Sequence, residues 1–262
     1  MERLGPQDPR GLRPHPGRTG TEVIDLSVVI PAFNEEKRLG PVFDEVLAYL
    51  SRGKESWEIV VADDGSTDGT VRMSEERAAR EPRIRVVRLP QNQGKGAAVR
   101  AGMLAAKGRW RLFRDADRST AMAEFDKFRP LLEKGSQVVI ASRHVPGSSL
   151  PEPQPLPRRL FGRGYILLSR LMILYEIRDF TCGFKCFTAE ASEGIFPKQR
   201  IERWAFDAEL LFLAKKAGFA IEQVPVTWRD EPGSKVRIGL DIARSLYEMA
   251  LIRLFDLRGL YR

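Results

Sequence analysis

The sequence of 262 residues is poor in the side chains that disulfide-rich and zinc proteins depend on. It contains two cysteines, Cys182 and Cys186, and two histidines. A Cys-x-x-x-Cys pair without clustered histidines gives neither a disulfide framework nor the usual spacing of a zinc site. We therefore expect two buried, free thiols.

Long apolar runs are also missing. The chain nowhere holds the roughly 18 uninterrupted apolar residues that a membrane-spanning helix needs. Residues 1–22 are rich in Pro, Gly and Arg and lack the apolar centre of a signal peptide, so they predict a disordered basic tail. Together these absences predict a cytoplasmic protein.

Two common nucleotide-binding loops are absent as well. A dinucleotide-binding fold has Gly-x-Gly-x-x-Gly after its first strand, where this chain has Pro-Ala-Phe-Asn-Glu at 31–35, and no Gly-Lys-Ser/Thr loop occurs. The Gly-Lys-Gly at 94–96 fits a phosphate loop and an ordinary helix entry equally well. A bound nucleotide would therefore be held by side-chain carboxylates and a metal ion.

The sequence does contain a regular alternation of strands and helices. Short apolar runs predict strands at 26–30, 57–62, 84–88, 110–113 and 137–141. Apolar residues at helical spacing predict helices at 35–51, from 68, and at 94–106. This alternation indicates an α/β fold with a mostly parallel, Rossmann-like sheet and helices on both faces. We expect this domain at 23–239 and an amphipathic C-terminal helix at 240–262.

Polar residues follow the predicted strands, at the edge where parallel sheets bind ligands. Asp63 and Asp64 follow the second strand, and Asp115-Ala116-Asp117 follows the fourth. Two carboxylates one residue apart can turn toward one divalent cation, since Mg²⁺ and Mn²⁺ prefer oxygen ligands and leave positions open for substrate phosphates. Adjacent acids after an apolar strand need hydrogen-bond donors, and a base or ribose would provide them for Asp63 and Asp64.

The order of these motifs resembles a known enzyme family. The motifs at 29–35, 61–70, 92–96 and 115–117 are similar to those of the family 2 glycosyltransferases, which have the GT-A fold. Further motifs at 141–147, 179–185, 203–209 and 228–235 resemble the branch that glycosylates polyprenyl or dolichyl phosphate, above all the dolichyl-phosphate β-glucosyltransferases.

The resemblance implies a nucleotide-sugar site. Its residues would be Pro31, Phe33, Glu35, Asp63, Asp64, Asp115, Ala116, Asp117, Arg229 and Lys235. Asp63 and Asp64 would face the base and ribose, while Asp115 and Asp117 would hold Mg²⁺ or Mn²⁺. Ser119 stands where related mannosyl enzymes often have a metal-binding Gln, which leaves the third protein ligand open.

The resemblance also implies catalytic and acceptor residues. Arg229 and Lys235 match an Arg–Lys pair that clamps the donor diphosphate from a mobile loop and would act with Asp117 in catalysis. Arg143, with Arg158 or Arg159, would meet the phosphate of the acceptor.

Reaction chemistry agrees with these roles. Negative charge develops on the departing diphosphate, where a divalent metal and basic side chains lower the barrier. A phosphate monoester has a second pKa of about 6, so as the nucleophile it needs positioning by arginines more than it needs a carboxylate base. A single displacement would invert the linkage of the sugar.

Two segments bear on a lipid acceptor. The apolar run at 158–175 is interrupted by Arg170 and flanked by arginines, and 240–254 carries one apolar stripe. Both patterns fit helices that lie in a membrane interface, and both also fit helices buried in a core.

Our sequence-based prediction is an inverting, metal-dependent transfer of a hexose, first of all glucose from UDP-glucose, to polyprenyl phosphate. We expect a peripheral protein on the cytoplasmic face of an anionic membrane, with or without a membrane-anchoring partner. The alternatives are mannosyl transfer from GDP-mannose, a soluble acceptor, and a silent nucleotide-sugar binding module. The net charge of +8 favours a polyanionic partner, but no recognition motif indicates nucleic acid.

Overall fold

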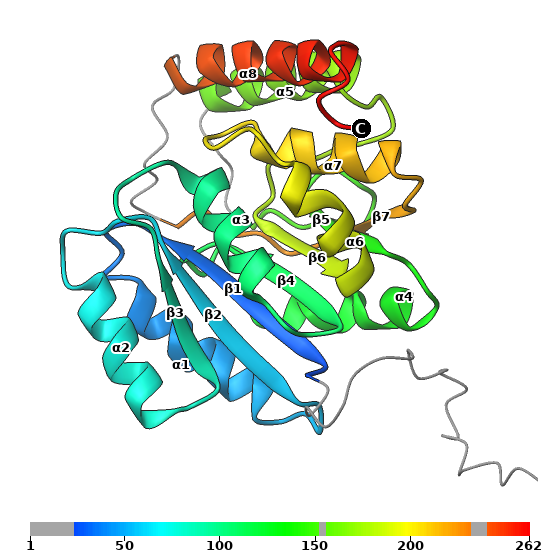
Figure 1. Ribbon diagram of the computed structural model, residues 1–262. Helices are drawn as coiled ribbons and strands as arrows, with labels where there is room; N and C mark the ends of the chain where they lie inside the picture. The colour runs from blue at the N-terminus through cyan, green and yellow to red at the C-terminus, as the bar shows by residue number, and fades with distance from the viewer. Residues whose placement is uncertain (1–23, 152–155, 232–239) are drawn as a thin grey trace, which may run out of the picture.

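The computed structural model describes residues 24–151, 156–231 and 240–262, which form a seven-stranded sheet between layers of helices (Figure 1). The strands are β1 (Leu26–Ala32), β2 (Trp57–Asp63), β3 (Ile84–Arg88), β4 (Trp110–Arg114), β5 (Val138–Ser142), β6 (Phe184–Thr188) and β7 (Ile221–Pro225). Their order across the sheet is β3-β2-β1-β4-β6-β5-β7, and β6 runs antiparallel to both of its neighbours.

The helices cover both faces of this sheet. They are α1 (Leu39–Leu50), α2 (Thr70–Arg80), α3 (Lys95–Ala105), α4 (Arg129–Glu133), α5 (Leu156–Met172), α6 (Ala189–Ile195), α7 (Phe206–Lys216) and α8 (Leu240–Leu257), with 3-10 turns η1 (Met122–Lys127) and η2 (Phe196–Lys198). Figure 1 shows α8 and α5 side by side at the top of the molecule, above α7.

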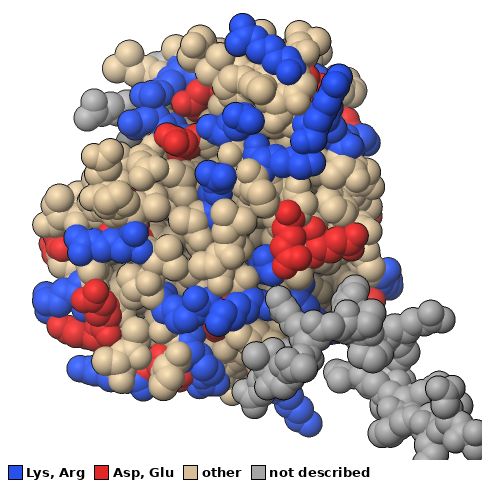
Figure 2. All heavy atoms as spheres, viewed as in Figure 1, with Lys and Arg blue, Asp and Glu red and all other residues tan. Residues whose placement is uncertain are grey.

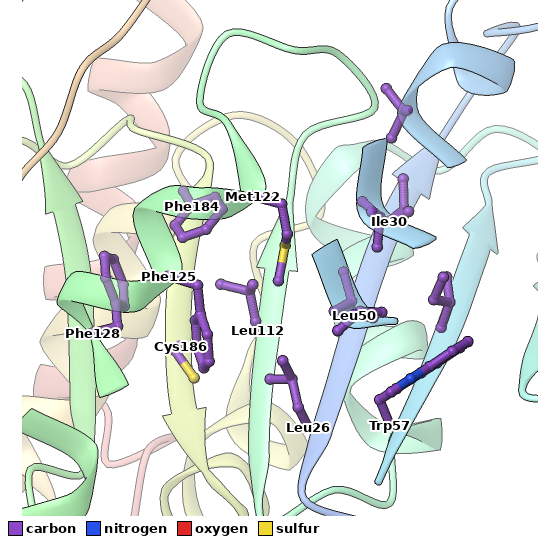
Figure 3. Packing of buried hydrophobic residues seen from close by; sticks show 14 of the residues in the cluster. Leu26, Ile30, Leu50, Trp57, Leu112, Met122, Phe125, Phe128, Phe184 and Cys186 are labelled. Carbon is purple, nitrogen blue, oxygen red and sulfur yellow. The ribbon is translucent and has the colours of Figure 1, made fainter. Parts of the chain in front are cut away.

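The core divides into two clusters because side chains along each strand alternate between the two faces. Val28 and Ile30 of β1 belong to the cluster under α1 and η1, whereas Val29 belongs to the cluster under α3, α6 and α7. In the first cluster, Phe125 of η1 lies beside Leu112 of β4, and Phe128, which follows η1, packs edge-on against Phe184 of β6 (Figure 3).

The topology brings the polar strand ends to one edge. β1, β2 and β4 are parallel, and β5 points the same way because both β4 and β5 are antiparallel to β6. Asp63, Asp115 and Ser142 therefore end their strands, or directly follow them, on the same edge of the sheet, which we call the rim.

Much of the predicted fold is confirmed. All five predicted strands are present, and the prediction of a mostly parallel α/β sheet holds, although β6 and β7 were not anticipated. The first helix begins at Leu39 rather than at 35, because the N–H groups of Arg38 and Leu39 first close a turn on the carbonyl of Glu35. The predicted tail at 1–22 lies outside the described residues.

Candidate active site

The centre of the rim is the loop after β4. The N–H of Asp115 donates to the carbonyl of Gly183 (2.9 Å), and the carboxylate of Asp115 lies directly against that glycine. A Cβ at Gly183 would come within 2.3 Å of the carboxyl carbon and of both its oxygens. Only glycine therefore leaves room for Asp115 in this position.

Asp117 lies on the same loop and feels the charge of Asp115. Burial and the neighbouring Asp115 carboxylate both raise the pKa of Asp117, while hydrogen bonds from Ser119 lower it. One of these bonds runs from the Ser119 N–H to Oδ1 of Asp117 (3.0 Å). Ser119 thus orients Asp117.

The two carboxylates fit a divalent cation. Two crowded, like-charged carboxylates gain stabilisation from a cation between them. Within the described residues, Asp, Glu, His and Cys side chains form no group of three or more that could complete a metal site. A metal held by Asp115 and Asp117 would therefore take its other ligands from elsewhere, and the predicted ligand role of Ser119 stays a prediction.

A lysine that the sequence analysis did not assign lies beside this pair. Lys95, the first residue of α3, places its ammonium 2.5 Å from Oδ1 of Asp115. Burial alone would lower the pKa of Lys95, but the carboxylates of Asp115 and Asp207 outweigh it and raise that pKa. Asp207 in turn forms a buried ion pair with Lys185 (2.5 Å). The Gly-Lys-Gly motif was the available signal, but it did not distinguish this role from a helix entry.

Asp63 and Asp64 obtain their hydrogen-bond donors from the protein. Oδ2 of Asp63 accepts from the N–H groups of Gly65 and Ser66, both at 3.1 Å. Asp64 accepts from the N–H groups at 93 and 94 and from the side-chain amide at 92. The acids do find the donors that the sequence analysis expected them to need, but these donors come from the protein rather than from a nucleotide. Their contact with base and ribose stays a prediction.

The loop after β1 is tied to the loop after β2. Glu35 is buried, pairs with Arg38 at 2.7 Å, and its N–H donates to the hydroxyl of Thr70. Asn34 has a positive φ of 53° and accepts from the N–H of Thr67. Pro31 lies buried within β1, and Phe33 is half-buried. The predicted nucleotide residues of both loops thus form one wall at the acidic part of the rim, which we call the acidic side (31–35, 63–70 and 115–117).

The segment after β7 runs beside the loop that carries Asp115 and Asp117. The N–H of Arg229 donates to the carbonyl of Ser119 (2.9 Å), and Trp228 forms a bridge with Thr120. The side chain of Arg229 is exposed. The structure therefore places the backbone of Arg229 beside the loop that carries Asp115 and Asp117, and its role at the donor diphosphate stays a prediction. Lys235 lies outside the described residues.

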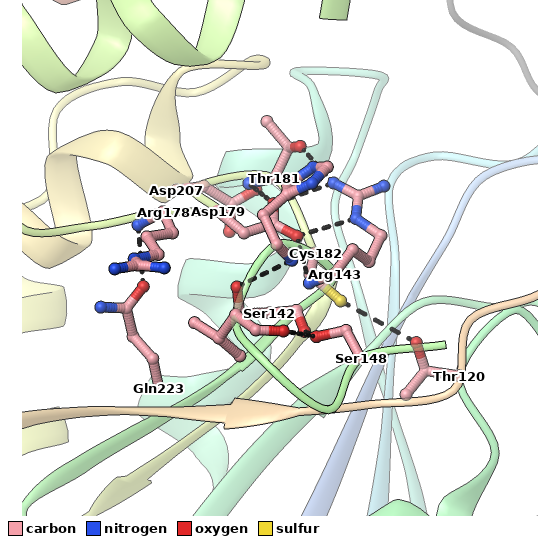
Figure 4. A network of polar contacts seen from close by, with 12 residues as sticks. Thr120, Ser142, Arg143, Ser148, Arg178, Asp179, Thr181, Cys182, Asp207 and Gln223 are labelled. Atoms are coloured by element: carbon pink, nitrogen blue, oxygen red, sulfur yellow. Dashed lines mark hydrogen bonds and ion pairs between the residues drawn. The ribbon is translucent and has the colours of Figure 1, made fainter. Parts of the chain in front are cut away.

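Basic side chains lie at another part of the rim, which we call the basic side. It consists of Arg143 and His144 after β5, Arg170 of α5 and Arg178 before β6. Arg143 forms two parallel bonds with the fully buried Asp179, at 2.8 and 2.9 Å, and a third with the hydroxyl of Thr181 (Figure 4). Asp179 raises the pKa of Arg143 against the opposing effect of burial, and Arg143 lowers the pKa of Asp179 against the same effect.

This pairing changes the interpretation of Arg143. One edge of its guanidinium, expected to meet an acceptor phosphate, is already bound to a carboxylate, so contact with phosphate stays a prediction for its remaining atoms. Arg158 and Arg159 lie in the first turns of α5, and their side chains are outside the described part of the structure. A cavity of about 310 Å³ is lined by His144, Ile166, Leu167, Arg170 and Arg178.

The C-terminal helix α8 has one side in the core and another exposed. Met249 and Ile252 of α8 pack into the second core cluster, and the hydroxyl groups of Ser245 and Tyr165 hydrogen-bond α8 to α5 (3.0 Å). The opposite face of α8 and the adjoining α5 leave large apolar side chains exposed. These are Leu167, Leu168, Leu171 and Tyr175 at α5, and Leu240, Tyr247, Leu254, Leu257 and Leu260 at α8.

Basic side chains accompany this exposed apolar surface. Arg244, Arg253 and Arg258 are exposed on or just after α8, and Figure 2 shows Lys and Arg side chains around the top of the molecule, where α8 lies. None of the helices that the structure describes is both long and apolar enough to cross a membrane. The two helices thus have one face in the core and another face exposed.

Comparisons with known proteins agree with this architecture. The sequence profile described as glycosyl transferase family 2 matches residues 27–196. A dolichyl-phosphate beta-glucosyltransferase of Trichomonas vaginalis is 36% identical over 93% of this chain and 76% of its own length. The human protein of that name is 35% identical, over 90% of this chain and 77% of its own length.

Solved structures share the fold. Glucosyl-3-phosphoglycerate synthase from Mycobacterium tuberculosis, crystallised with Mn²⁺, UDP-glucose and phosphoglyceric acid, superposes with a TM-score of 0.64 at 21% identity, covering 90% of this chain and 85% of that one. Mannosyl-3-phosphoglycerate synthase from Rubrobacter xylanophilus gives a TM-score of 0.62 at 20% identity, covering 90% of this chain and 74% of that one.

The mixed sheet, which the chain shares with these solved structures, is the GT-A fold of glycosyltransferases. Within that class, the profile match over most of the sheet and the identity to curated relatives settle the membership. The chain belongs to glycosyl transferase family 2.

Proposed function

We propose that this protein transfers glucose from UDP-glucose to the phosphate of a polyprenyl or dolichyl phosphate, with inversion at the sugar. The observation that carries the proposal is that the segment of Arg229 hydrogen-bonds to Ser119 of the loop that carries Asp115 and Asp117. Relatives that match over nine-tenths of the chain carry the name dolichyl-phosphate beta-glucosyltransferase, which favours this sugar and this acceptor over mannose and a soluble acceptor.

The acidic side would hold the donor. Asp115 and Asp117 would bind Mg²⁺ or Mn²⁺, which neutralises charge on the diphosphate as the sugar leaves. The glucosyl-3-phosphoglycerate synthase that shares this fold has been crystallised with Mn²⁺ and UDP-glucose. Arg229 lies one backbone hydrogen bond from this loop, so its guanidinium can reach the same diphosphate, and Lys235 would approach it from the same segment.

Residues 31–35 and 63–64 would surround the nucleoside. Their loops are fixed to one another by hydrogen bonds between Asn34 and Thr67 and between Glu35 and Thr70. A preformed wall loses little conformational freedom when a base and ribose bind against it.

The basic side would receive the acceptor phosphate. The cavity between β5 and α5 combines Arg170 and Arg178 with the aliphatic Ile166 and Leu167, which suits a phosphate attached to an apolar chain. A phosphate oxygen attacking the sugar carbon needs no carboxylate base, and the described cavity lining contains none. Arg143, with Arg158 or Arg159, would orient the same phosphate.

Contact with a membrane would bring the lipid to this cavity. The exposed apolar side chains of α5 and α8, flanked by arginines, fit the interface of an anionic bilayer on its cytoplasmic face. A membrane-anchoring partner could add to this contact.

The test is turnover of UDP- and GDP-sugars with a short-chain polyprenyl phosphate and Mn²⁺ or Mg²⁺. We expect lipid-linked glucose from UDP-glucose, and Asp117→Ala should lower the rate by at least about a hundredfold. Arg178→Gln should raise the KM for the lipid while leaving hydrolysis of UDP-glucose unchanged. A mannosylated lipid from GDP-mannose would contradict the proposed donor, and donor hydrolysis without any lipid product would contradict the acceptor.

A further inference from the structure

The ammonium of Lys95 lies beside the two carboxylates proposed to bind the metal ion. Oδ1 of Asp115 is buried, and among the described residues it faces the ammonium of Lys95 at 2.5 Å. The other carboxylate of the loop, Asp117, lies close enough to raise the pKa of Lys95 in turn. Lys95 thus forms an ion pair with Asp115 and also interacts electrostatically with Asp117.

Contacts of the surrounding backbone fix the position of Lys95. It begins α3 directly after Gly94, whose φ is +123° and whose Cβ, if present, would lie 2.5 Å from the carbonyl oxygen of Glu202. The N–H of residue 97 donates to that same carbonyl (3.0 Å), so the start of the helix is fixed from outside.

The neighbouring acid is already neutralised. Asp207 is buried and binds Lys185 at 2.5 Å, and Lys185 donates a second bond to the carbonyl of Cys182 (2.7 Å). Asp207 therefore has its own counter-charge. Lys95 is the ion-pair partner of Asp115, and its charge also lowers the pKa of Asp117.

We propose that Lys95 is the resident counter-cation of the Asp115–Asp117 pair and makes metal binding depend on the nucleotide. Without donor, its ammonium balances Asp115, so a free divalent cation gains little by binding. When cation and diphosphate arrive together, the cation replaces the ammonium at Asp115 and the diphosphate supplies Lys95 with a new anionic partner. The proposal rests on the metal assignment made under the proposed function.

Removing the ammonium should change two affinities in opposite directions. One less positive charge among three carboxylates attracts a lone divalent cation more strongly, whereas a diphosphate loses a cationic partner. General damage to the fold would weaken both. The sign of the change in metal affinity therefore separates the proposed role from a structural one.

The experiment measures Mn²⁺ binding without nucleotide, by titration calorimetry or by the electron paramagnetic resonance of free Mn²⁺. We expect Lys95→Met to bind Mn²⁺ about tenfold more tightly than the natural sequence and to bind UDP, at saturating Mn²⁺, about tenfold more weakly, within the usual range of coupling between two ligands. Lys95→Arg keeps the charge and should keep both affinities near their natural values.

The matched control is Lys107→Met. Lys107 follows the other end of the same helix and is exposed, so this variant has the same net charge as Lys95→Met without a change at the rim. Its Mn²⁺ and UDP affinities should be those of the natural sequence, and thermal unfolding should confirm that all variants are folded.

The possible failures are distinguishable. If Asp117→Ala abolishes Mn²⁺ binding but Lys95→Met leaves it unchanged or weaker, the counter-cation role is overturned and the metal site stands. If Mn²⁺ binding persists in Asp117→Ala, both the metal assignment and the role of Lys95 are overturned. If neither the natural protein nor Lys95→Met binds Mn²⁺ without nucleotide, the counter-cation role is overturned, and Mn²⁺ binding in the presence of UDP then tests the metal assignment separately.

Discussion

The acidic and basic sides of the rim each contain a basic residue paired with an aspartate. The two pairs differ in the burial of the aspartate and in the number of hydrogen bonds that it accepts. On the basic side, Asp179 is fully buried and accepts four bonds, from the N–H, Nε and Nη2 of Arg143 and from the N–H of Thr181. On the acidic side, Asp115 is one-third exposed and faces one ammonium.

The difference separates a structural pair from an exchangeable one. A buried carboxylate with all its acceptor positions filled cannot leave its partner without exposing two bare charges to a low dielectric. A half-open pair with one contact can exchange its cation for another. The presence of charged residues therefore does not identify a ligand site. What distinguishes the two sides is the number of hydrogen bonds within the protein that a ligand would have to replace.

The largest effect should come from breaking the closed pair. Asp179→Asn leaves the guanidinium of Arg143 without its counter-charge, and we expect the free energy of unfolding at pH 7 to fall by about 3–5 kcal/mol. Chemical denaturation measures this loss. Asp44→Asn, which removes an exposed partner of Arg77, should cost less than about 1 kcal/mol. Equal losses in the two variants would contradict the contrast between the sides.

The same variant has a pH signature. Since the folded-state pKa of Asp179 lies below its unfolded value, the unfolded chain takes up the proton first as the pH falls. The stabilisation is fully present above the unfolded pKa of about 4 and is lost as the pH falls through the folded value. The gap in stability between natural protein and Asp179→Asn should therefore shrink below about pH 4. A gap that stays constant to lower pH would argue against the ion pair as its source.

A smaller effect, on activity, should follow from disturbing the open pair. Gly183→Ala puts a methyl group 2.3 Å from the Asp115 carboxylate, which must move away from the place where we propose that it binds a metal. We expect transfer to fall about a hundredfold, the size of effect seen when one electrostatic group is removed from an active site. The control Gly194→Ala makes only ordinary contacts with Phe219, at 3.4 Å, and should keep full activity. Unchanged transfer in Gly183→Ala would mean that the position of Asp115 is not critical.

The two sides also differ in how far the sequence predicts them. The strands and the carboxylate motifs of the acidic side are local patterns, an apolar run followed by polar residues, and they were predicted from sequence. β6 was missed because its buried Lys185 interrupts the apolar pattern, and the charge that makes this burial possible, Asp207, lies in a distant helix.

The pairings themselves could not be predicted. Lys95 meets Asp115, and Arg143 meets Asp179, only because the sheet order places the ends of separate strands together. A single sequence shows that a charge is present but not which distant residue satisfies it. The sequence therefore suggested an acceptor ligand at Arg143, where the fold shows a guanidinium bound to a carboxylate.

A further contrast concerns the surface next to the basic side. Leu171 of α5 and Leu257 of α8 are 63% and 84% exposed, and each is expected to enter a membrane interface. Replacing both with Ser should lower binding to vesicles of anionic lipid by at least about tenfold, given about 1.5–3 kcal/mol for a fully buried Leu. Flotation with vesicles measures this binding, and Leu104→Ser on α3 is the control. Loss of binding in the control alone would place the membrane contact near the acidic side instead.

The smallest expected effect is the absence of cysteine labelling in the folded protein. It tests the segment 179–183, which joins Asp179 of the basic side to Gly183 beside Asp115 and which we call the junction. Burial, with the nearby Asp179, raises the pKa of the Cys182 thiol to about 12, and Cys186 is buried as well, which confirms the expectation of two buried, free thiols. Since the thiolate is the reactive form, neither cysteine should react with Ellman's reagent in the folded protein at neutral pH. Both should react in denaturant, whereas Asp179→Asn, which loosens the closed pair beside Cys182, should react measurably faster than the natural protein. Fast labelling of the natural protein would show that the junction opens, and the basic side would then be no more closed than the acidic one.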